Sequence, residues 1–149
     1  MINTIIDAVA DYRTLIIPAC VWTVAQLLKV LIALVKDKRL DFTYLTSMGG
    51  MPSAHSALVC SLATTIGKLH GTTSPIFALA TFLALIVMYD AQGVRQTVGI
   101  QSNILNRMLD ELLKGQPAFE ERLKELIGHS NLEVFVGAIL GIGLAWWWA

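Results

Sequence analysis

The sequence predicts an all-α membrane protein, a polytopic bundle of about four transmembrane helices. Hydrophobic residues make up 55% of the 149 residues and charged residues only 15%. Several apolar stretches approach the roughly 20 residues that cross a bilayer as a helix. Trp146, Trp147 and Trp148 end the last stretch, where an interfacial aromatic belt is expected. This length favours one membrane-embedded domain over residues 1–149.

The four expected spans differ in how apolar they are. Residues 14–35 are almost continuously apolar, and at about 1.5 Å per residue they can cross the hydrocarbon layer. The stretch 54–69 is shorter and more polar, whereas 74–88 is strongly apolar and 132–149 carries the tryptophans. The residues before the first span lack a basic region and a cleavage site, so this span is expected to stay in the mature protein.

Between the third and fourth spans, the sequence predicts amphipathic helices that lie along the membrane surface. Apolar residues recur there with helical period against charged ones, the apolar set being Ile104, Leu105, Met108, Leu109, Leu112 and Leu113. The segment Gly115-Gln116-Pro117 interrupts this pattern, and a shorter amphipathic helix is expected from about Phe119 to Gly128.

Charge counting predicts the orientation and excludes one class of partner. The first and third connections hold most of the basic residues, so both are expected on the cytoplasmic side of the cell membrane. The second connection, which contains His70 as a surface residue, is expected outside. The formal net charge is zero, without a basic stripe, so nucleic acid is not an expected partner.

Neither a cofactor nor a metal site is predicted. Cys20 and Cys60 lie in apolar stretches without a C-x-x-C motif or a histidine cluster, which argues against a disulfide framework or zinc. Both cysteines are expected to pack at membrane depth. A bundle this small also makes a homodimer plausible.

Polar residues in and near the spans are the candidates for chemistry. Lys29 lies in the cytoplasmic half of the first span, one turn from Gln26. Its ammonium either reaches the headgroups by snorkelling or belongs to a polar strip inside the bundle. Asp90 and Arg95 follow the third span, where an arginine suits a phosphate. They are equally interpretable as an interfacial anchor or a terminating ion pair.

Two helix starts contain histidine. Gly49-Gly50-Met51-Pro52-Ser53-Ala54-His55 forms a glycine-rich turn into a helix, whose free amides can hold an anion. An N-capping serine with an incidental histidine explains the same residues. Before the last span, Glu133 stands four residues after His129 and can orient its imidazole. Ser130 and Glu133 also match a capping box.

Taken in order, these motifs resemble one known superfamily. The chain has a lysine in an early span, then Gly-Gly-Met-Pro-Ser-Ala-His-Ser-Ala, Tyr-Asp-Ala-Gln-Gly-Val-Arg, and Gly-His-x-x-x-Glu-Val followed by x-x-Gly. This order resembles the type-2 phosphatidic acid phosphatase and vanadium-dependent haloperoxidase superfamily, most closely its short divergent branch.

The resemblance implies a role for each matching residue. His129 is expected to be the nucleophile, Glu133 to orient it, and His55 to protonate the leaving group. Lys29, Ser53, Arg95 and Gly50 are expected to bind phosphate, with Asp90 as a possible addition.

The expected function is therefore metal-independent hydrolysis of a lipid phosphate through a phosphohistidine. A cytoplasmic site favours phosphatidylglycerophosphate or phosphatidic acid as the substrate. Two alternatives stay open, an isoprenoid diphosphate phosphatase and a non-catalytic membrane protein that binds anionic headgroups. A vanadate-dependent peroxidase is disfavoured, because nothing in the sequence indicates a peroxide site.

Overall fold

A computed structural model describes residues 2–37, 50–112 and 131–149, and within these ranges the chain is entirely α-helical. The helices are α1 (Ile2–Asp37), α2 (Ala54–His70), α3 (Pro75–Leu112) and α4 (Asn131–Trp148). No strand occurs in these ranges. The prediction of an all-α protein is thus confirmed for the described part of the chain.

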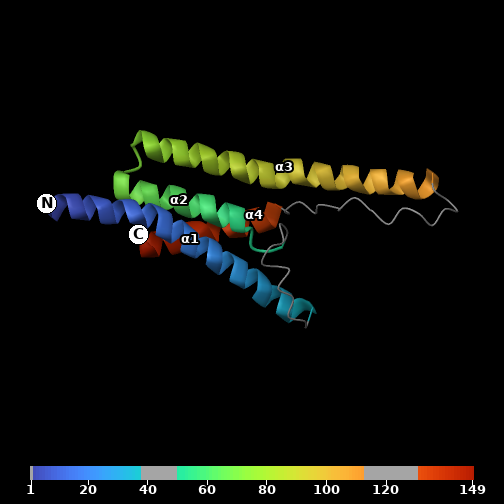
Figure 1. Cartoon of the computed structure of the whole chain (residues 1–149), viewed down its shortest axis with the longest axis horizontal. Coiled ribbons are helices and arrows are strands. Elements are labelled where there is room, and N and C mark those ends of the chain that lie inside the picture. Colours follow the sequence, from blue (N-terminus) through green and yellow to red (C-terminus); the bar gives the residue numbers. More distant parts are fainter. Residues whose placement is uncertain (1, 38–49, 113–130) are drawn as a thin grey trace.

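Helix α2 lies at the centre of the bundle and packs against the other three helices. Figure 1 shows α1 and α3 on opposite sides of α2, with α4 beside α2 and α1. Successive helices run in alternating directions, so both chain termini lie at the same end of the bundle (Figure 1). The ends of α1 and α3 and the starts of α2 and α4 point the other way.

Helix α1 is longer than the predicted span because it begins at Ile2. Its apolar part, Tyr12–Val35, contains Pro18 without ending the helix. Proline removes one backbone donor, and transmembrane helices tolerate this where neighbouring groups satisfy the freed carbonyl. The buried face of α1 carries Ile17, Val21 and Ala25, which join the core between α1, α2 and α4.

Helix α2 has well-defined ends. Ser53 is the N-cap, and Gly71, with a φ of 83°, is the C-cap. A residue with this φ is most easily glycine, because a side chain meets steric resistance in the left-handed region. Ser74 then donates its hydroxyl to the Gly71 carbonyl at 2.8 Å, and α3 begins at Pro75, a favoured residue for the first turn of a helix.

Helix α3 differs from the prediction because it runs without interruption from Pro75 to Leu112. The expected separate surface helix is therefore the second half of the same helix, which extends beyond the other helices (Figure 1). Ile100, Ile104, Leu105 and Met108 expose their side chains there. The second expected surface helix, from about Phe119, lies outside the described residues, as do Leu113 and the Gly115-Gln116-Pro117 break.

Helices α2 and α4 cross at very short range through glycine. Gly137 and Gly141 are buried on α4. A Cβ atom added at Gly137 would collide with the Ser53 carbonyl oxygen, and one at Gly141 with the Ala57 carbonyl oxygen. Small residues let membrane helices approach until their backbones touch. This contact places the start of α4 directly against the turn that begins α2.

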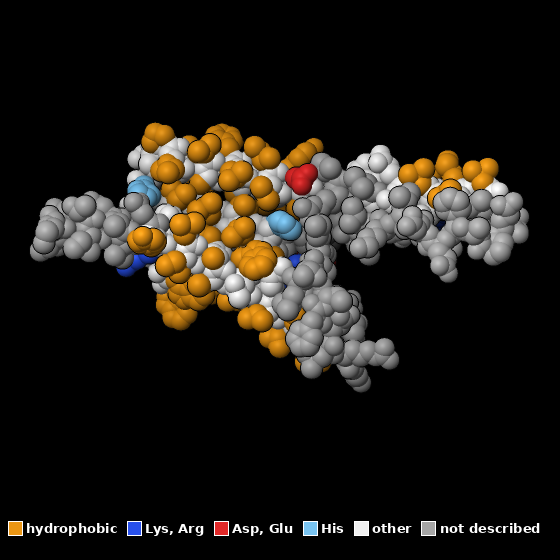
Figure 2. Space-filling model, viewed as in Figure 1, with side chains coloured by type: hydrophobic (Ala, Val, Ile, Leu, Met, Phe, Trp, Pro, Cys, Tyr) orange, Lys and Arg blue, Asp and Glu red, His pale blue; other side chains and the backbone are white. Residues whose placement is uncertain are grey.

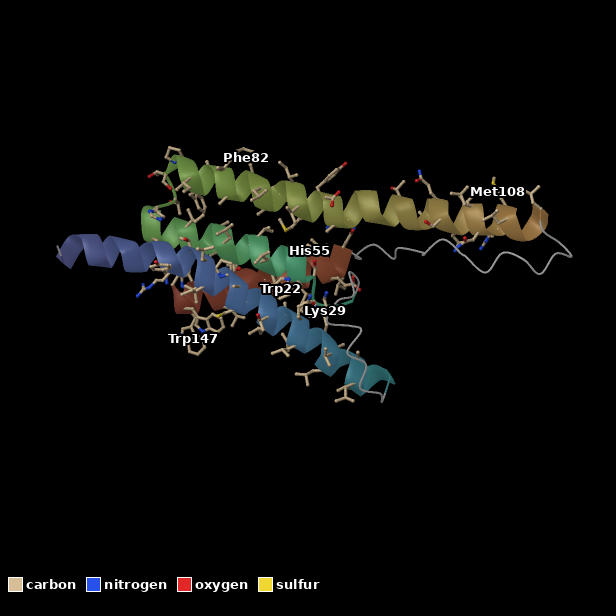
Figure 3. The ribbon with its side chains drawn as sticks, viewed as in Figure 1. Trp22, Lys29, His55, Phe82, Met108 and Trp147 are labelled. Carbon is tan, nitrogen blue, oxygen red and sulfur yellow. The ribbon has the colours of Figure 1, made fainter. Side chains whose placement is uncertain are left out.

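Polar contacts hold the C-terminal residues against α1 and α2 at the far end of the bundle. Lys68 donates to the Trp146 carbonyl at 2.7 Å and lies 5.2 Å from the centre of the Trp146 ring. Arg13 donates to the Ala149 carbonyl oxygen at 3.5 Å. Trp147 is exposed at this end (Figure 3), as an interfacial aromatic belt requires. His70 is exposed here as well, as predicted.

Three of the described helices are long and apolar enough to cross a membrane, through the segments Tyr12–Val35, Pro75–Gly93 and Asn131–Trp148. At 17 residues, α2 is shorter than these three. Hydrophobic side chains cover the middle of the bundle, and the charged and histidine side chains visible in Figure 2 lie toward its two ends. The chain therefore has the surface of a membrane protein.

Candidate functional site

Lys29 is buried inside the bundle. Its side chain is only 3% exposed, and Gln26, one turn earlier on the same helix face, is 8% exposed. Burial of this degree fits the polar strip facing the interior and not a lysine that snorkels to the headgroups. Figure 3 shows Lys29 at the same end of the bundle as His55, where α2 and α4 begin.

The turn before α2 is shaped by Gly50 and Ser53. Gly50 has a φ of 95°, a conformation that favours glycine, and the Met51–Pro52 peptide bond is cis. Ser53 is fully buried, and its hydroxyl oxygen accepts hydrogen bonds from the Ser56 amide at 3.4 Å and the Ser56 hydroxyl at 3.1 Å. The N-cap explanation of Ser53 is therefore correct, and Ser56 is a second buried hydroxyl beside it.

The first turn of α4 is fastened to this turn through the backbone. The Ser53 amide donates to the Glu133 carbonyl oxygen at 3.0 Å. Gly137, one turn further along α4, packs against the backbone of Ser53. Glu133 stands in the first turn of α4, where the helix dipole favours a negative charge. Two motifs about 80 residues apart in the chain are thus joined by a hydrogen bond.

An electrostatic attraction links α1 to the same end of the bundle, where α2 and α4 begin. The Glu133 carboxylate is close enough to exert a Coulomb attraction on the Lys29 ammonium. Both side chains belong to the interacting residues of the bundle. Since Lys29 is buried and Glu133 half-buried, water screens this attraction less than it would at the surface.

His55 and Asp90 lie around this cluster. His55 is half-buried in the first turn of α2, two residues after Ser53. Asp90 is half-buried on α3, within the candidate span Pro75–Gly93. Gln92 on α3 and Asn131 on α4 line one common groove, so the level of Asp90 along α3 is close to that of Glu133 along α4.

Other predicted residues are outside what the structure describes. The backbone of Arg95 belongs to α3, but its side chain is outside the described part. His129 lies two residues before α4 and also falls outside, together with Ser130. The structure therefore brings together Lys29, Ser53 and Glu133 and places Gly50 and His55 in and directly after the same turn. The roles of His129 and Arg95 remain predictions from the resemblance.

The sequence interpretation gave no role to two features of the site, although Ser56 and Gly137 lie within the quoted motifs. Ser56 is buried against Ser53, and Gly137 with Gly141 sets the distance between α2 and α4. The G-x-x-x-G spacing in an apolar helix is the sequence signal that could have identified the glycine pair. The signal for Ser56 is weaker, because a serine in the first turn of a helix is ordinary.

The cluster combines a buried cation, a serine-capped helix start and a carboxylate at one end of a membrane bundle. The positive end of the α2 helix dipole and the Lys29 ammonium suit an anion such as a phosphate. The carboxylate of Glu133 can accept a proton or orient a neighbouring donor. Such a set can bind a phosphorylated headgroup and assist an acid or base reaction on it.

Comparisons with known proteins agree with this membrane architecture. The model of a family described as the Divergent PAP2 family matches residues 10–144. The chain is also 37% identical to the Uncharacterized membrane protein YuiD of Bacillus subtilis (strain 168), over 79% of this chain and 82% of that protein. No solved structure matches the chain.

Proposed function

Because the chain belongs to the Divergent PAP2 family, we propose that it is a membrane phosphatase that hydrolyses a lipid phosphate. The observation that carries this proposal is the meeting of Lys29, Ser53 and Glu133 from three helices at one end of the bundle. The Ser53 amide to Glu133 carbonyl hydrogen bond and the Glu133 to Lys29 attraction define that meeting.

The proposed reaction has two displacement steps at phosphorus. In the first, a nitrogen of His129 attacks phosphorus, the bond to the lipid oxygen breaks, and His55 donates a proton to that oxygen. The products are a lipid alcohol and a phosphohistidine. In the second step, water attacks the phosphohistidine, His55 takes a proton from it, and the P–N bond breaks. Inorganic phosphate leaves and both histidines return to their starting states.

Charge stabilisation in this scheme comes from the protein. The transition state carries negative charge on the phosphoryl oxygens. Lys29, the amides at the start of α2 and, by the resemblance, Arg95 are the donors that oppose it. Glu133 holds the imidazole of His129 in one tautomer, as the acid of a hydrolytic triad does. Gly50 gives the phosphate access to the backbone of the turn, and Asp90 borders the site from α3.

The proposed topology has four spans in the cell membrane with the site on the cytoplasmic face. Helix α2 is included as a span because it forms the centre of the bundle and is flanked by α1, α3 and α4 along its length. The alternating helix directions point the ends of α1 and α3, which lead into the connections with most basic residues, toward the site end (Figure 1). Basic connections favour the cytoplasmic side, and the inner leaflet then supplies phosphatidylglycerophosphate or phosphatidic acid.

Phosphate release by the purified protein tests the proposal. Lipid monophosphates and isoprenoid diphosphates are presented in mixed micelles, with His129→Ala as the control. Release from a glycerolipid monophosphate that disappears in His129→Ala supports the proposal. Faster release from isoprenoid diphosphates would favour the second phosphatase class. Binding of anionic lipid without any phosphate release would instead indicate a headgroup-binding protein.

A further inference from the structure

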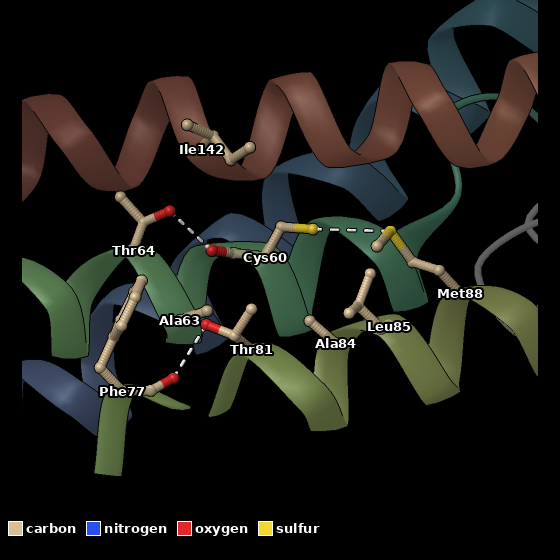
Figure 4. A pocket seen from close by; sticks show the side chains of 9 residues that line it. All are labelled: Cys60, Ala63, Thr64, Phe77, Thr81, Ala84, Leu85, Met88 and Ile142. Carbon is tan, nitrogen blue, oxygen red and sulfur yellow. Dashed lines mark hydrogen bonds between the residues drawn. The ribbon is translucent and has the colours of Figure 1, made fainter. Parts of the chain in front are cut away.

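An apolar groove runs between α3 and α4, which barely touch each other although both pack on α2. Its inner part is a cavity of about 220 Å³ between α2, α3 and α4, lined by residues that include Cys60, Phe77, Ala84 and Ile142 (Figure 4). Its outer part has a volume of about 790 Å³ and is lined by Val134, Phe135 and Ala138 of α4 facing α3. Leu85 and Met88 line both parts, so the groove is continuous.

The inner part is apolar even though two threonines line it. The Thr64 hydroxyl donates to the Cys60 carbonyl and the Thr81 hydroxyl to the Phe77 carbonyl, each at 2.8 Å (Figure 4). Each hydroxyl is thereby satisfied within its own helix. The Cys60 thiol contacts the Met88 sulfur at 3.7 Å. The two hydroxyls and the thiol are therefore already engaged within the protein, and the inner part of the groove favours an apolar ligand.

The outer end of the groove adjoins the proposed site. Gln92 and Asn131 line this end, and Asn131 begins α4 two residues before Glu133. Val134, which follows Glu133, is a buried part of the groove wall. A ligand whose phosphate lies beside Lys29 and the start of α2 can therefore extend its apolar part toward the groove.

The dimensions fit a hydrocarbon chain. From Gln92 to Phe77 the groove follows α3 for about 22 Å, and from Asn131 to Ile142 it follows α4 for about 16 Å. The inner part, with a volume of about 220 Å³, is open along one side, where the lining residues Leu85 and Ile142 are 53% and 48% exposed. A long, narrow and open apolar groove of this kind suits one flexible acyl chain.

We propose that this groove holds one acyl chain of the lipid whose phosphate is hydrolysed, so that the substrate is an acylated glycerolipid phosphate entering sideways between α3 and α4. This inference rests on the proposed function for the position of the phosphate. The chain orients the substrate. Moving the acyl chain from the bilayer into the groove changes the affinity for the substrate little, because the surrounding lipid tails are as apolar as the groove.

The inner end of the groove sets the longest chain that fits. Phe77 packs against Gly67 of α2, where an added Cβ atom would come within 2.8 Å of the ring. Ile142 lines the same part of the groove from α4. A larger side chain at Ile142 shortens the groove, whereas one at Ala138 blocks it near its middle.

A substitution series with matched substrates tests this proposal. Ala138→Trp should lower kcat/KM for a long-chain phosphatidic acid by about tenfold or more, because overpacking keeps the chain out. The same variant should leave hydrolysis of a soluble aryl phosphate within about twofold. Ile142→Trp should affect long chains and spare short ones. Ile139→Trp is the control, because Ile139 is exposed on α4 and is not a lining residue.

A photo-crosslinking measurement on the unmodified protein needs no catalysis. A phosphatidic acid with a diazirine at the end of one acyl chain should label α3 and α4 at residues around Thr81 and Ile142. Labelling spread over the whole lipid-facing surface would overturn the groove proposal, as would equal losses for all substrates in Ala138→Trp. A switch from dimer to monomer in Ala138→Trp with unchanged chain preference would also overturn it, in favour of a second copy. If no substrate is hydrolysed but labelling is confined to the groove, the groove proposal stands and the proposed function fails.

Discussion

Lys29 is the most informative single residue. Burying a cation in a membrane helix costs free energy, and such residues usually have a function. Lys29 faces the bundle interior, 3% exposed, with Glu133 as an electrostatic partner. Replacing a buried ion pair by apolar or neutral groups is often neutral or stabilising, whereas removing one partner is destabilising. Substitutions of Lys29 and Glu133, singly and together, can therefore separate effects on stability from effects on activity.

We expect Lys29→Met to lower the thermal midpoint and to reduce kcat by about 10²–10³-fold, the usual effect of losing one transition-state donor. Adding Glu133→Gln should restore the midpoint without restoring activity. Thermal unfolding in detergent and phosphate release from the same preparations provide the two readouts. Recovery of activity in the double variant would mean that Lys29 serves only to balance Glu133.

His55 should matter only as far as the leaving group needs a proton. A positioned general acid typically contributes about 10²–10⁴-fold, so His55→Ala should show that loss with a lipid phosphate, whose alkoxide leaves poorly. An aryl phosphate with an acidic phenol should lose much less. Equal losses for both substrates would show that His55 holds phosphate or structure. The matched pair of substrates is the control.

At the scale of single residues, the sequence interpretation was most successful where a motif has a local meaning. The turn at Gly50 and the cap at Ser53 follow from residue type and order. The choice for Lys29 between snorkelling and the bundle interior could not be made from one helix, because it depends on which face the neighbours cover. The proximity of Ser53 to Glu133 depends on the packing of α4, which no local pattern specifies.

At the scale of helices, the crossing of α2 and α4 gives a sharp test. We expect Gly137→Ala and Gly141→Ala each to destabilise the bundle by about 1–3 kcal/mol, the usual cost of overpacking, because each new Cβ meets backbone atoms of α2. Gly143→Ala is the matched control, since nothing lies within 4 Å of a Cβ there. Thermal midpoints measured side by side provide the comparison.

Activity should separate the two glycine positions. Gly137 packs on Ser53 and Gly141 on Ala57, so Gly137→Ala should disturb the site more than Gly141→Ala at similar stability. Loss of stability in Gly143→Ala equal to that of the other two would contradict this account of the crossing.

Helix α3 shows why the end of a span does not mark the end of a helix. The sequence changes there from uniformly apolar to amphipathic, and the prediction took this as a new element. Between Pro75 and Leu112 there is no further proline, and the isolated glycines Gly93 and Gly99 do not stop the helix. The change in pattern therefore reports a change in surroundings, while the backbone continues.

At the scale of the molecule, the alternating helices and basic connections predict which side the site faces. In a variant with Cys20 and Cys60 replaced by serine, Thr72→Cys should react with an impermeant maleimide in intact cells, and Arg107→Cys should react only after the cells are opened. Labelling at 107 but not at 72 would overturn the orientation and the inner-leaflet substrates with it.

The overall architecture was predictable because long apolar stretches, caps and an aromatic cluster are properties of sequence. The number of spans was harder to predict. Helix α2 is only 17 residues long, and its central position is visible only in the packing of the bundle. The site lies where three helices meet, and each contributes one or two residues that are ordinary on their own. The order of the motifs, and not any single one, made the family recognisable.

Trapping the phosphoenzyme tests the central claim most directly. The purified protein is mixed with a lipid phosphate carrying a ³²P label, in EDTA, and denatured within the first turnovers at alkaline pH, where a phosphohistidine survives. The account predicts label on the chain that acid removes, located at His129 and absent from His129→Ala, together with phosphate release in the chelator. Phosphate release that requires added magnesium and leaves no label on the chain would contradict it.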